Sequence, residues 1–465
     1  MRATTLPAAA VRAPVRRSRA DLVVLGVEAA LVVLAAVVGA VLNARGVGLY
    51  ADAAPLYATW RPHLGWGSPG AVLVAGAVIG VGTRWARTAG WAALLGAAYL
   101  ASVAWTLSLA LVDGWSTGFA ERLTPQAEYL HEVPQVTDVR AMLAGFAGRI
   151  LDFQPDSWST HTAGHPPGAL LVFVGLDRVG LGGGVAAALA CALIGASVTI
   201  SVPVALRALG AADAARAVLP FLVLLPGAVW VGASADGLFT GVVAAGLALL
   251  AVRGRAAPAA GGLLLGFALY LSYGFVLVGV LALAVLALRP AGRVAALLAG
   301  TAGVAAVAVA FTVAGFRWWD GYRLVVERYY QGWAADRPYG YWMWANLAAL
   351  LLSAGPVLGP ALLRAVTAGA RATRSGIRHR GGWRGRAGQM LAAGPAVLLP
   401  VAAAAAVLAG DLSGLSKAEV ERIWLPFAVW LLVATAHLPP STRRWWLLGQ
   451  AGTALAVNHL LWTVS

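Results

Sequence analysis

Long apolar runs recur from one end of this chain to the other, and each is long enough to cross a bilayer as a helix. A hydrocarbon core of about 30 Å needs roughly 17 to 25 apolar residues per helical span. Of the 465 residues, 60% are hydrophobic and only 11% are charged. A soluble chain of this length has no interior large enough for so much apolar surface. The sequence therefore predicts an all-α polytopic integral membrane protein.

We expect about 13 transmembrane helices, with surface helices in one long extracytoplasmic loop. Their predicted bounds are 22–42, 70–88, 90–112, 183–206, 217–233, 236–252, 259–273, 274–289, 294–315, 346–365, 389–409, 423–438 and 445–463. The segment YLSYG (270–274) is either a tight turn between two spans or a kink within one. Two spans are favoured, because one span fewer would move the basic run 370–386 to the other side of the membrane.

The net charge of +15 comes from arginines gathered in short connections between the apolar runs. These basic connections are 82–88, 207–216, 252–258, 289–293, 370–386 and 441–446. Lys and Arg accumulate in cytoplasmic loops of membrane proteins, and with a cytoplasmic N-terminus every basic connection falls on that side. The first apolar run is too long for a signal-peptide core, so we expect an uncleaved anchor in the cytoplasmic membrane. Membrane lipids are expected partners, and nucleic acid is not.

This topology divides the chain into segments without a separate soluble domain. They are a basic cytoplasmic tail (1–21), a three-helix membrane segment (22–112), an extracytoplasmic catalytic loop (113–182), a membrane core (183–315), an aromatic extracytoplasmic loop (316–345) and C-terminal helices (346–465) with a basic cytoplasmic loop (366–388). Within the long loop, 137–153 and 167–180 have apolar residues at helical spacing. Both are predicted to lie on the membrane surface as helices.

Polar residues that can carry chemistry collect in the predicted outer connections. Asp113 follows the third span, and Glu128 lies further along the same loop. A partly desolvated carboxylate there could act as a general base. The alternative for Asp113 is a boundary residue that marks the water interface.

The loop SWSTHTAGHPPGALL (157–171) contains His161 and His165 at a spacing that can bind metal on a helix. No Glu accompanies the first histidine as in zinc proteases, so no metal is predicted. Pro166 and Pro167 favour a helix end followed by a helix start. His165 is expected to be held rigidly at the surface, with an N–H available for a phosphate or a sugar hydroxyl. A purely structural loop is the alternative.

Two further outer segments combine charges with aromatic or apolar residues. The candidate substrate-binding residues there are Asp320, Arg323, Arg328 and Tyr329 in 316–344, and Lys417, Glu421 and Arg422 in 411–427. Aromatic faces beside charged groups suit sugars, and cations just above the bilayer suit a lipid phosphate. An aromatic belt and snorkelling cations are the alternatives. Asp236 is one more outer acid, whose alternative role is to cap the next helix.

The order of these features resembles the GT-C glycosyltransferases, which include the aminoarabinose and protein mannosyl transferases. An acid ends an early span and a long loop ends in HPPG (165–168), similar to the family's HPPL or KPPL. The stretches LPFLVLLPGAVWVGASADGLFTGVVAAGLALLA (219–251) and GGLLLGFALYLSYG (261–274) then follow. The sequence departs from the family at Gly114, where a second acid is expected, and at Ser272 or Tyr273, where a Lys is expected.

The resemblance implies a polyprenyl-phosphate-linked sugar donor used on the outer face of the membrane. Asp113 would be the base, with Glu128 as second choice. HPPG would shape the pocket, and Lys417 or Arg422 would meet the donor phosphate. The acceptor would be an envelope glycan, a lipid or a protein, and no cofactor is expected, with a divalent cation compatible but not indicated. A transporter or lipid-linked saccharide flippase, a non-catalytic assembly component and a ligase acting on a polyprenyl diphosphate are the alternatives.

Overall fold

The computed structural model describes residues 19–463 except 233, 378–390 and 392. It is 74% helix and 1% strand, which confirms the predicted all-α class. One feature was not predicted from the sequence: strands β1 (Ala58–Trp60) and β2 (Leu461–Thr463) pair antiparallel. This small ribbon ties the end of the chain to the connection that follows the first helix. The predicted tail 1–21 and basic loop 366–388 lie partly outside the described residues.

Among the described residues, six helices are long and apolar enough to cross a membrane, and a bent helix pair would make a seventh. They are α1 (Arg19–Ala44), the composite helix α2 (Gly67–Ala77) to α3 (Thr83–Thr88), α4 (Trp91–Ala110), the composite helix α8 (Gly184–Ala196) to α9 (Val198–Ala208), α15 (Arg293–Val313) and α20 (Pro395–Leu412). The bent pair is α17 (Tyr339–Ala354) with α18 (Leu358–Ile377). These helices support membrane embedding, while the expected count of about 13 spans is not confirmed.

The remaining helices of the described chain are shorter or, like the 18-residue α23, less apolar. They are α5 (Val139–Gly145), α6 (Thr160–Gly164), α7 (Gly168–Arg178), α10 (Ala212–Val223), α11 (Ala228–Val231), α12 (Ala235–Ala251), α13 (Ala256–Leu269), α14 (Val278–Leu288), α16 (Trp318–Gln331), α21 (Val420–Ile423), α22 (Leu425–Leu431) and α23 (Arg443–Leu460). Single π or 3-10 turns cover Val78–Gly82, Ser116–Ala120, Tyr129–His131, Val133–Gln135, Phe146–Arg149, Tyr273–Leu277 and Leu432–His437.

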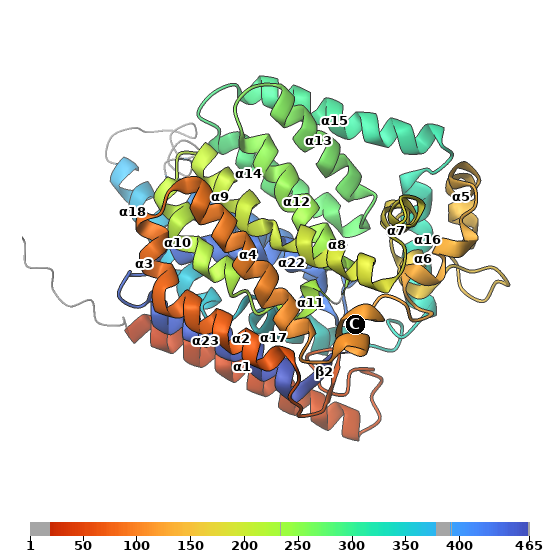
Figure 1. The fold of residues 1–465 in the computed structure, drawn as a ribbon, viewed down its shortest axis with the longest axis horizontal. Coiled ribbons are helices and arrows are strands. Elements are labelled where there is room, and N and C mark those ends of the chain that lie inside the picture. Colours follow the sequence, from red (N-terminus) through yellow and green to blue (C-terminus); the bar gives the residue numbers. More distant parts are fainter. Residues whose placement is uncertain (1–18, 233, 378–390, 392, 464–465) are drawn as a thin grey trace, which may run out of the picture.

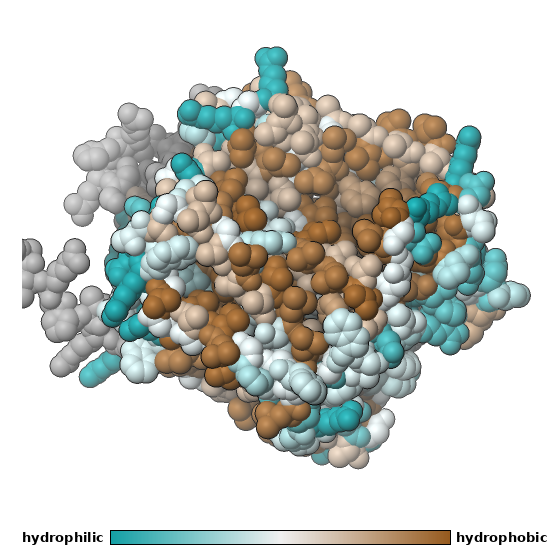
Figure 2. Space-filling model, viewed as in Figure 1, coloured by the Kyte–Doolittle hydropathy of each residue, from teal (hydrophilic) through white to brown (hydrophobic). Residues whose placement is uncertain are grey.

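The connections between helices gather at two opposite ends of the bundle (Figure 1). At one end, arginines of the predicted inner connections bind backbone carbonyls of neighbouring connections, as Arg216 does with Ala86 and Ala89. At the other end lie α5, α6, α7 and α16, which belong to the predicted outer loops. Figure 2 shows apolar side chains filling the middle of one face, with hydrophilic side chains gathered toward its left and right ends. The end with α5, α6, α7 and α16 holds the candidate site, and we call it the polar end.

The chain reverses direction between α13 and α14. Arg289, just after α14, donates hydrogen bonds to the carbonyls of Leu250 and Val252, which immediately precede the connection into α13. The start of α13 and the end of α14 therefore lie at the same end of the bundle. The prediction of a turn near YLSYG (270–274), rather than a kink in a continuous helix, is confirmed.

Two predicted straight spans are broken. The segment 217–233 contains the end of α10, a break at Leu224–Gly227 and the short helix α11. The segment 346–365 is split at Gly355–Val357, where α17 and α18 meet at 95°. The two breaks touch, because the Gly227 N–H donates a 2.7 Å hydrogen bond to the Ser353 carbonyl. Proline and glycine at such breaks end the helix, and partners across the break satisfy the freed backbone groups.

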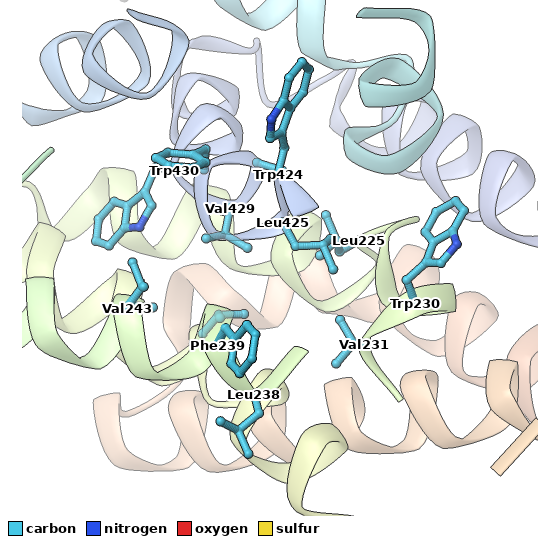
Figure 3. Close-up of a cluster of buried hydrophobic side chains, with 14 of the residues drawn as sticks. Leu225, Trp230, Val231, Leu238, Phe239, Val243, Trp424, Leu425, Val429 and Trp430 are labelled. Carbon is cyan, nitrogen blue, oxygen red and sulfur yellow. The ribbon is translucent and has the colours of Figure 1, made fainter. Parts of the chain in front are cut away.

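The core of the bundle is an aromatic and aliphatic cluster between α11, α12 and α22. Phe239 and Val243 of α12 lie on the side toward Leu425, Val429 and Trp430 of α22, with Trp230 and Val231 of α11 beside them and Leu238 pointing away from α22 (Figure 3). Each of these side chains is at most 5% exposed. This packing holds the start of α12, with Asp236, close to α21, with Arg422.

Candidate functional site

A buried ionic network lies at the polar end of the bundle, centred on Arg422 of α21. Its Nη1 atom lies 2.7 Å from Oδ2 of Asp236, and its Nη2 atom lies 2.5 Å from Oε2 of Glu419. Asp236 is in the first turn of α12, so residues far apart in the sequence meet here. A buried cation of this kind is stable only if it is paired, and Arg422 has two carboxylates. We call Glu128, His161, Asp236, Glu419 and Arg422 the Arg422 network.

His161 joins the Arg422 network through both ring nitrogens. Its Nδ1 atom lies 2.7 Å from Oε1 of Glu128, and its Nε2 atom lies 3.4 Å from Nη2 of Arg422. His161 is in α6, and Glu128 precedes a short 3-10 turn earlier in the same loop. The structure therefore brings together four residues that the sequence singled out separately, namely Glu128, His161, Asp236 and Arg422.

Exposure within the Arg422 network is uneven. The side chains of Asp236 and Arg422 are each 6% exposed and that of Glu128 is 9% exposed. His161 and Glu419 are 21% and 22% exposed. A substrate that reaches the network therefore meets His161 and Glu419 first.

Glu419 is held in an unusual backbone conformation. Ala418 and Glu419 have φ angles of 72° and 62°, in the left-handed region that L-residues rarely adopt. The loop keeps this shape because its neighbours anchor it. Arg337 donates a 2.8 Å hydrogen bond to the Lys417 carbonyl, and the Ala418 N–H donates to Oδ1 of Asn346. Backbone strain of this kind is often found at binding and catalytic sites.

The charges of the Arg422 network shift the pKa values of its members. Burial lowers the pKa of His161, but the charge and hydrogen bond of Glu128 outweigh it, so the pKa is raised. Burial raises the pKa of Glu419, but Arg422 and Arg337 outweigh it, so the pKa is lowered. Burial lowers the pKa of Arg422, but the charges of Glu419 and Asp236 outweigh it, so the pKa is raised. The ion pairs are thus strong enough to hold charge in a buried place.

Asp113 lies in a second carboxylate–histidine pair, outside the Arg422 network. Its Oδ1 atom lies 2.7 Å from Nε2 of His63, whose Nδ1 atom lies 2.7 Å from the Arg61 carbonyl. Because a carbonyl only accepts, His63 carries a proton on Nδ1, and the other short contact needs a proton between Nε2 and Asp113. Burial raises the pKa of Asp113, while the hydrogen bond from His63 opposes the shift. The Asp113 carboxylate therefore shares a proton with His63 and is not free to act as a base.

The HPPG segment positions His161 and starts α7. The Nδ1 atom of His165 hydrogen-bonds the His161 carbonyl at 2.8 Å, and its ring packs against Tyr129 and Phe239. Desolvation lowers the pKa of His165 to about 4, so the ring is neutral at physiological pH. A Cβ atom on Gly168 would lie 2.5 Å from the Tyr270 carbonyl oxygen, so only glycine fits there. We expected the N–H of His165 to be available for a phosphate or a sugar hydroxyl, but the neutral ring donates its N–H at Nδ1 to the His161 carbonyl.

Lys417 and Glu421 make structural contacts. The Lys417 Nζ donates a 2.8 Å hydrogen bond to the Ala334 carbonyl, which holds the loop between α16 and α17. Oε1 of Glu421 accepts the Tyr57 N–H, and its backbone carbonyl accepts the Ser353 hydroxyl. Burial raises the pKa of Glu421 to about 7. Neither side chain points its charge to the open side of the Arg422 network in this structure.

The predicted residues of α16 divide between two environments. Tyr329 accepts the Lys417 N–H through its hydroxyl and so supports the loop below Glu419. Arg328 forms a 2.8 Å ion pair with Asp152, which ties α16 to the long outer loop. Asp320 pairs with Arg317 on the surface, and Arg323 is exposed. The structure therefore does not bring Asp320 or Arg323 into the Arg422 network.

Several residues of the site were not predicted from the sequence. They are His63, Arg337 and Glu419. Their role depends on contacts between connections that are far apart in the chain. Among the described residues, no group of three or more His, Cys, Asp or Glu side chains is arranged to hold a metal ion.

No protein family, curated protein or solved structure matches this chain. The resemblance to the GT-C glycosyltransferases therefore stays a prediction that is carried by its sequence motifs. The Arg422 network itself offers a histidine oriented by a carboxylate and a buried cation beside it. This combination can move a proton and stabilise a negative charge at adjacent positions.

Proposed function

We propose that this protein is a membrane glycosyltransferase that moves a sugar from a polyprenyl-phosphate-linked donor to an acceptor hydroxyl. The observation that carries the proposal is the Glu128–His161 pair placed directly beside Arg422 at the polar end of an apolar helix bundle. We further propose that the shorter apolar helices also cross the bilayer, giving about 13 spans. The N-terminus is then cytoplasmic and the polar end faces outward.

The acceptor hydroxyl loses its proton to the His161–Glu128 pair. Glu128 accepts the Nδ1 hydrogen bond and orients the ring, so the lone pair on Nε2 is the proton acceptor. The acceptor oxygen attacks the anomeric carbon of the donor sugar. The bond from that carbon to the phosphate oxygen breaks, and the electron pair leaves with the polyprenyl phosphate. Asp113 is the alternative base, less well supported because His63 already occupies its carboxylate.

The leaving phosphate is stabilised by Arg422. In the resting arrangement, Asp236 and Glu419 neutralise this guanidinium. Glu419 is the more exposed of the two and lies on the strained segment, so the donor phosphate displaces Glu419 and takes its place on Nη2. A phosphate thereby replaces the Glu419 carboxylate. Both are anions, so the charge of the buried Arg422 stays neutralised.

A transporter or flippase for lipid-linked saccharides is the second candidate. The observation that favours it is the contact between two broken helical segments, where Gly227 and Ser353 meet. Broken helices near the middle of a membrane protein are typical of transporters. They leave the Arg422 network without a role, however, so transfer is the better-supported function.

Lipid extraction from cells separates the two candidates. Cells that lack the protein should accumulate a polyprenyl-phosphate sugar, and the glycan, lipid or protein that normally receives the sugar should lose it. A transferase leaves the donor on the outer leaflet, where it can be oxidised by periodate added to intact cells. A flippase leaves it on the inner leaflet, protected from periodate, and this result would replace transfer by transport.

A further inference from the structure

An exposed aromatic pair lies next to the Arg422 network, on residues that the proposed mechanism does not use. Tyr50 and Trp333 stack with ring centroids 5.1 Å apart and planes at 10°. They come from two different outer connections, after α1 and after α16. Trp333 is 53% exposed and Tyr50 is 40% exposed. Because each ring covers one face of the other, the exposed area lies on their outer faces and edges.

The stacked pair is built rigidly. The Arg337 Nε donates a 3.1 Å hydrogen bond to the Leu49 carbonyl, and its Nη2 donates to the Tyr50 carbonyl. These bonds hold Tyr50 at a φ of 49°, a conformation that is unfavourable for tyrosine. On the other side, Lys417 holds the carbonyl of Ala334, next to Trp333. A binding surface fixed in advance loses little entropy when a ligand docks.

Acidic groups border the rings. Oδ2 of Asp336 accepts a 2.9 Å hydrogen bond from the Tyr50 hydroxyl, and both groups are exposed. Asp52, also exposed, lies close enough to act on the pKa of Tyr57. Carboxylates accept hydrogen bonds from sugar hydroxyls and repel phosphate. A flat aromatic face with acceptors at its edge therefore fits a neutral pyranose, whose hydroxyls donate while its C–H groups cover the ring.

Tyr57 connects this surface to the Arg422 network. The ring centroids of Tyr57 and Trp333 are 6.4 Å apart. The guanidinium carbon of Arg337 lies 5.9 Å from the centroid of the Tyr57 ring. Burial and the charge of Glu419 raise the pKa of the Tyr57 hydroxyl, so Glu419 is close to it as well. A ligand on Trp333 is thus separated from the open side of the Arg422 network by one side chain.

We infer that Tyr50, Trp333 and Asp336 form a binding subsite for a neutral pyranose ring. Its purpose rests on the proposed transfer function, but binding can be measured without transfer. The ring belongs either to the lipid-linked donor or to a soluble acceptor glycan, and both present the same chemistry to the subsite.

The test uses the full chain in lipid nanodiscs, labelled with 5-fluorotryptophan. The chain has 19 tryptophans, and the fluorine resonance that is missing in Trp333→Phe belongs to Trp333. Methyl glucopyranoside, mannopyranoside and galactopyranoside are added separately, and inorganic phosphate serves as the anionic control. We expect at least one pyranoside to shift the Trp333 resonance with saturation, and phosphate to leave it in place. A Trp333 resonance that no pyranoside moves would overturn the subsite and leave these rings as membrane-interface aromatics.

Variants test the same subsite from the ligand side, by saturation-transfer NMR of the bound pyranoside. Asp336→Asn and Trp333→Ala should each weaken binding about tenfold, which corresponds to one lost charge-assisted hydrogen bond or one lost ring contact. Trp66→Ala is the matched control, since Trp66 is 93% exposed on the same outer connection as Tyr50 and should bind like the unmodified chain. Unchanged binding in Trp333→Ala would contradict the inference. If a variant does not fold, the resonance shift in the unmodified chain still tests the subsite.

Two further experiments are needed. One shows whether the pyranose belongs to the donor or to the acceptor, and the other distinguishes failure of the subsite from failure of the transfer function. A Trp333 shift in nanodiscs that carry a polyprenyl-phosphate hexose assigns the subsite to the donor, and a shift only with soluble oligosaccharides assigns it to the acceptor. If pyranosides bind and no sugar is transferred, the transfer function fails and the subsite stands. If sugar is transferred while Trp333→Ala leaves the KM of donor and acceptor unchanged, the subsite fails and the transfer function stands.

Discussion

The Nδ1 atom of His161 lies 2.7 Å from Oε1 of Glu128, and the same ring presents Nε2 to Arg422 at 3.4 Å. Because the carboxylate accepts the Nδ1 proton, the neutral ring has its lone pair on Nε2. A carboxylate–histidine pair therefore faces a buried cation, where a proton can be accepted close to a stabilised negative charge. Asp113, which the sequence favoured as the base, shares its proton with His63 at 2.7 Å instead.

The Asp113–His63 pair is expected to act as one structural unit. Asp113→Asn and His63→Gln should each lower the midpoint of thermal unfolding by a similar amount. The double variant should lose little more than either single variant, since each change removes the same contact. Unfolding is followed with a thiol-reactive dye on Cys191, which is the only cysteine of the chain and is fully buried. Sugar transfer lost in Asp113→Asn and retained in His63→Gln would instead make Asp113 the base.

Removing the charge of Glu419 is expected to strengthen donor binding. In Glu419→Gln, Arg422 keeps Asp236 as partner, and its Nη2 no longer has a carboxylate to give up when phosphate arrives. The KM for the polyprenyl-phosphate sugar should fall about tenfold, which is the equivalent of 1.4 kcal/mol. Asp236→Asn is the comparison, since it removes the more buried partner and should lower stability. A KM that rises in Glu419→Gln would show that Glu419 assists the donor rather than competing with it.

The pH dependence of stability is expected to reflect His165. The unfolded chain protonates this histidine below its ordinary pKa of 6.5, whereas the folded ring stays neutral down to about 4. The unfolded state therefore binds more protons in this window, and stability should fall as pH falls from 6.5 to 4. His165→Gln cannot titrate, so its unfolding midpoint should depend less steeply on pH in the same window. An equal slope in both proteins would mean that other groups, such as the buried carboxylates, account for the loss.

The proposed orientation can be tested with single cysteines in a chain that carries Cys191→Ala. Trp66 lies near the Arg422 network end of the bundle and Arg255 at the opposite end, and both are exposed. A membrane-impermeant maleimide should label Trp66→Cys on intact cells and Arg255→Cys only after the membrane is opened. The reverse pattern would place the Arg422 network in the cytoplasm and remove outer-face lipid-linked donors as substrates.

Sequence reasoning predicted what depends on local composition. Apolar runs and arginine-rich connections predicted a helical bundle with two chemically different ends, and the turn near residue 270 followed from that alternation. The breaks at Gly227 and Gly355 were missed because a long apolar run reads as one span regardless of a bend. The β1–β2 ribbon pairs Ala58 with Thr463, and three-residue strands leave no periodic signal.

The candidate site was predicted residue by residue and not as an arrangement. Glu128, His161, Asp236 and Arg422 were each singled out as charges in outer connections, but nothing local indicates that Arg422 selects Asp236 and Glu419. The contacts of Lys417 and Glu421 were not predicted for the same reason, since their partners are the backbone groups of Ala334 and Tyr57. Hydrogen bonds to the backbone of a distant loop cannot be predicted from residue type.

The most direct measurement is sugar transfer by the purified full chain in proteoliposomes that contain a polyprenyl-phosphate sugar labelled in the sugar. The unmodified protein should move the label from the lipid to an acceptor in an envelope extract. Glu128→Gln should lower the pKa of His161 and slow transfer about 10²- to 10⁴-fold, the usual contribution of a general base. Glu121→Gln, an exposed carboxylate of the same loop, should transfer normally. Equal transfer by Glu128→Gln and the unmodified protein, or label that crosses the bilayer still attached to its lipid, would contradict the proposed function.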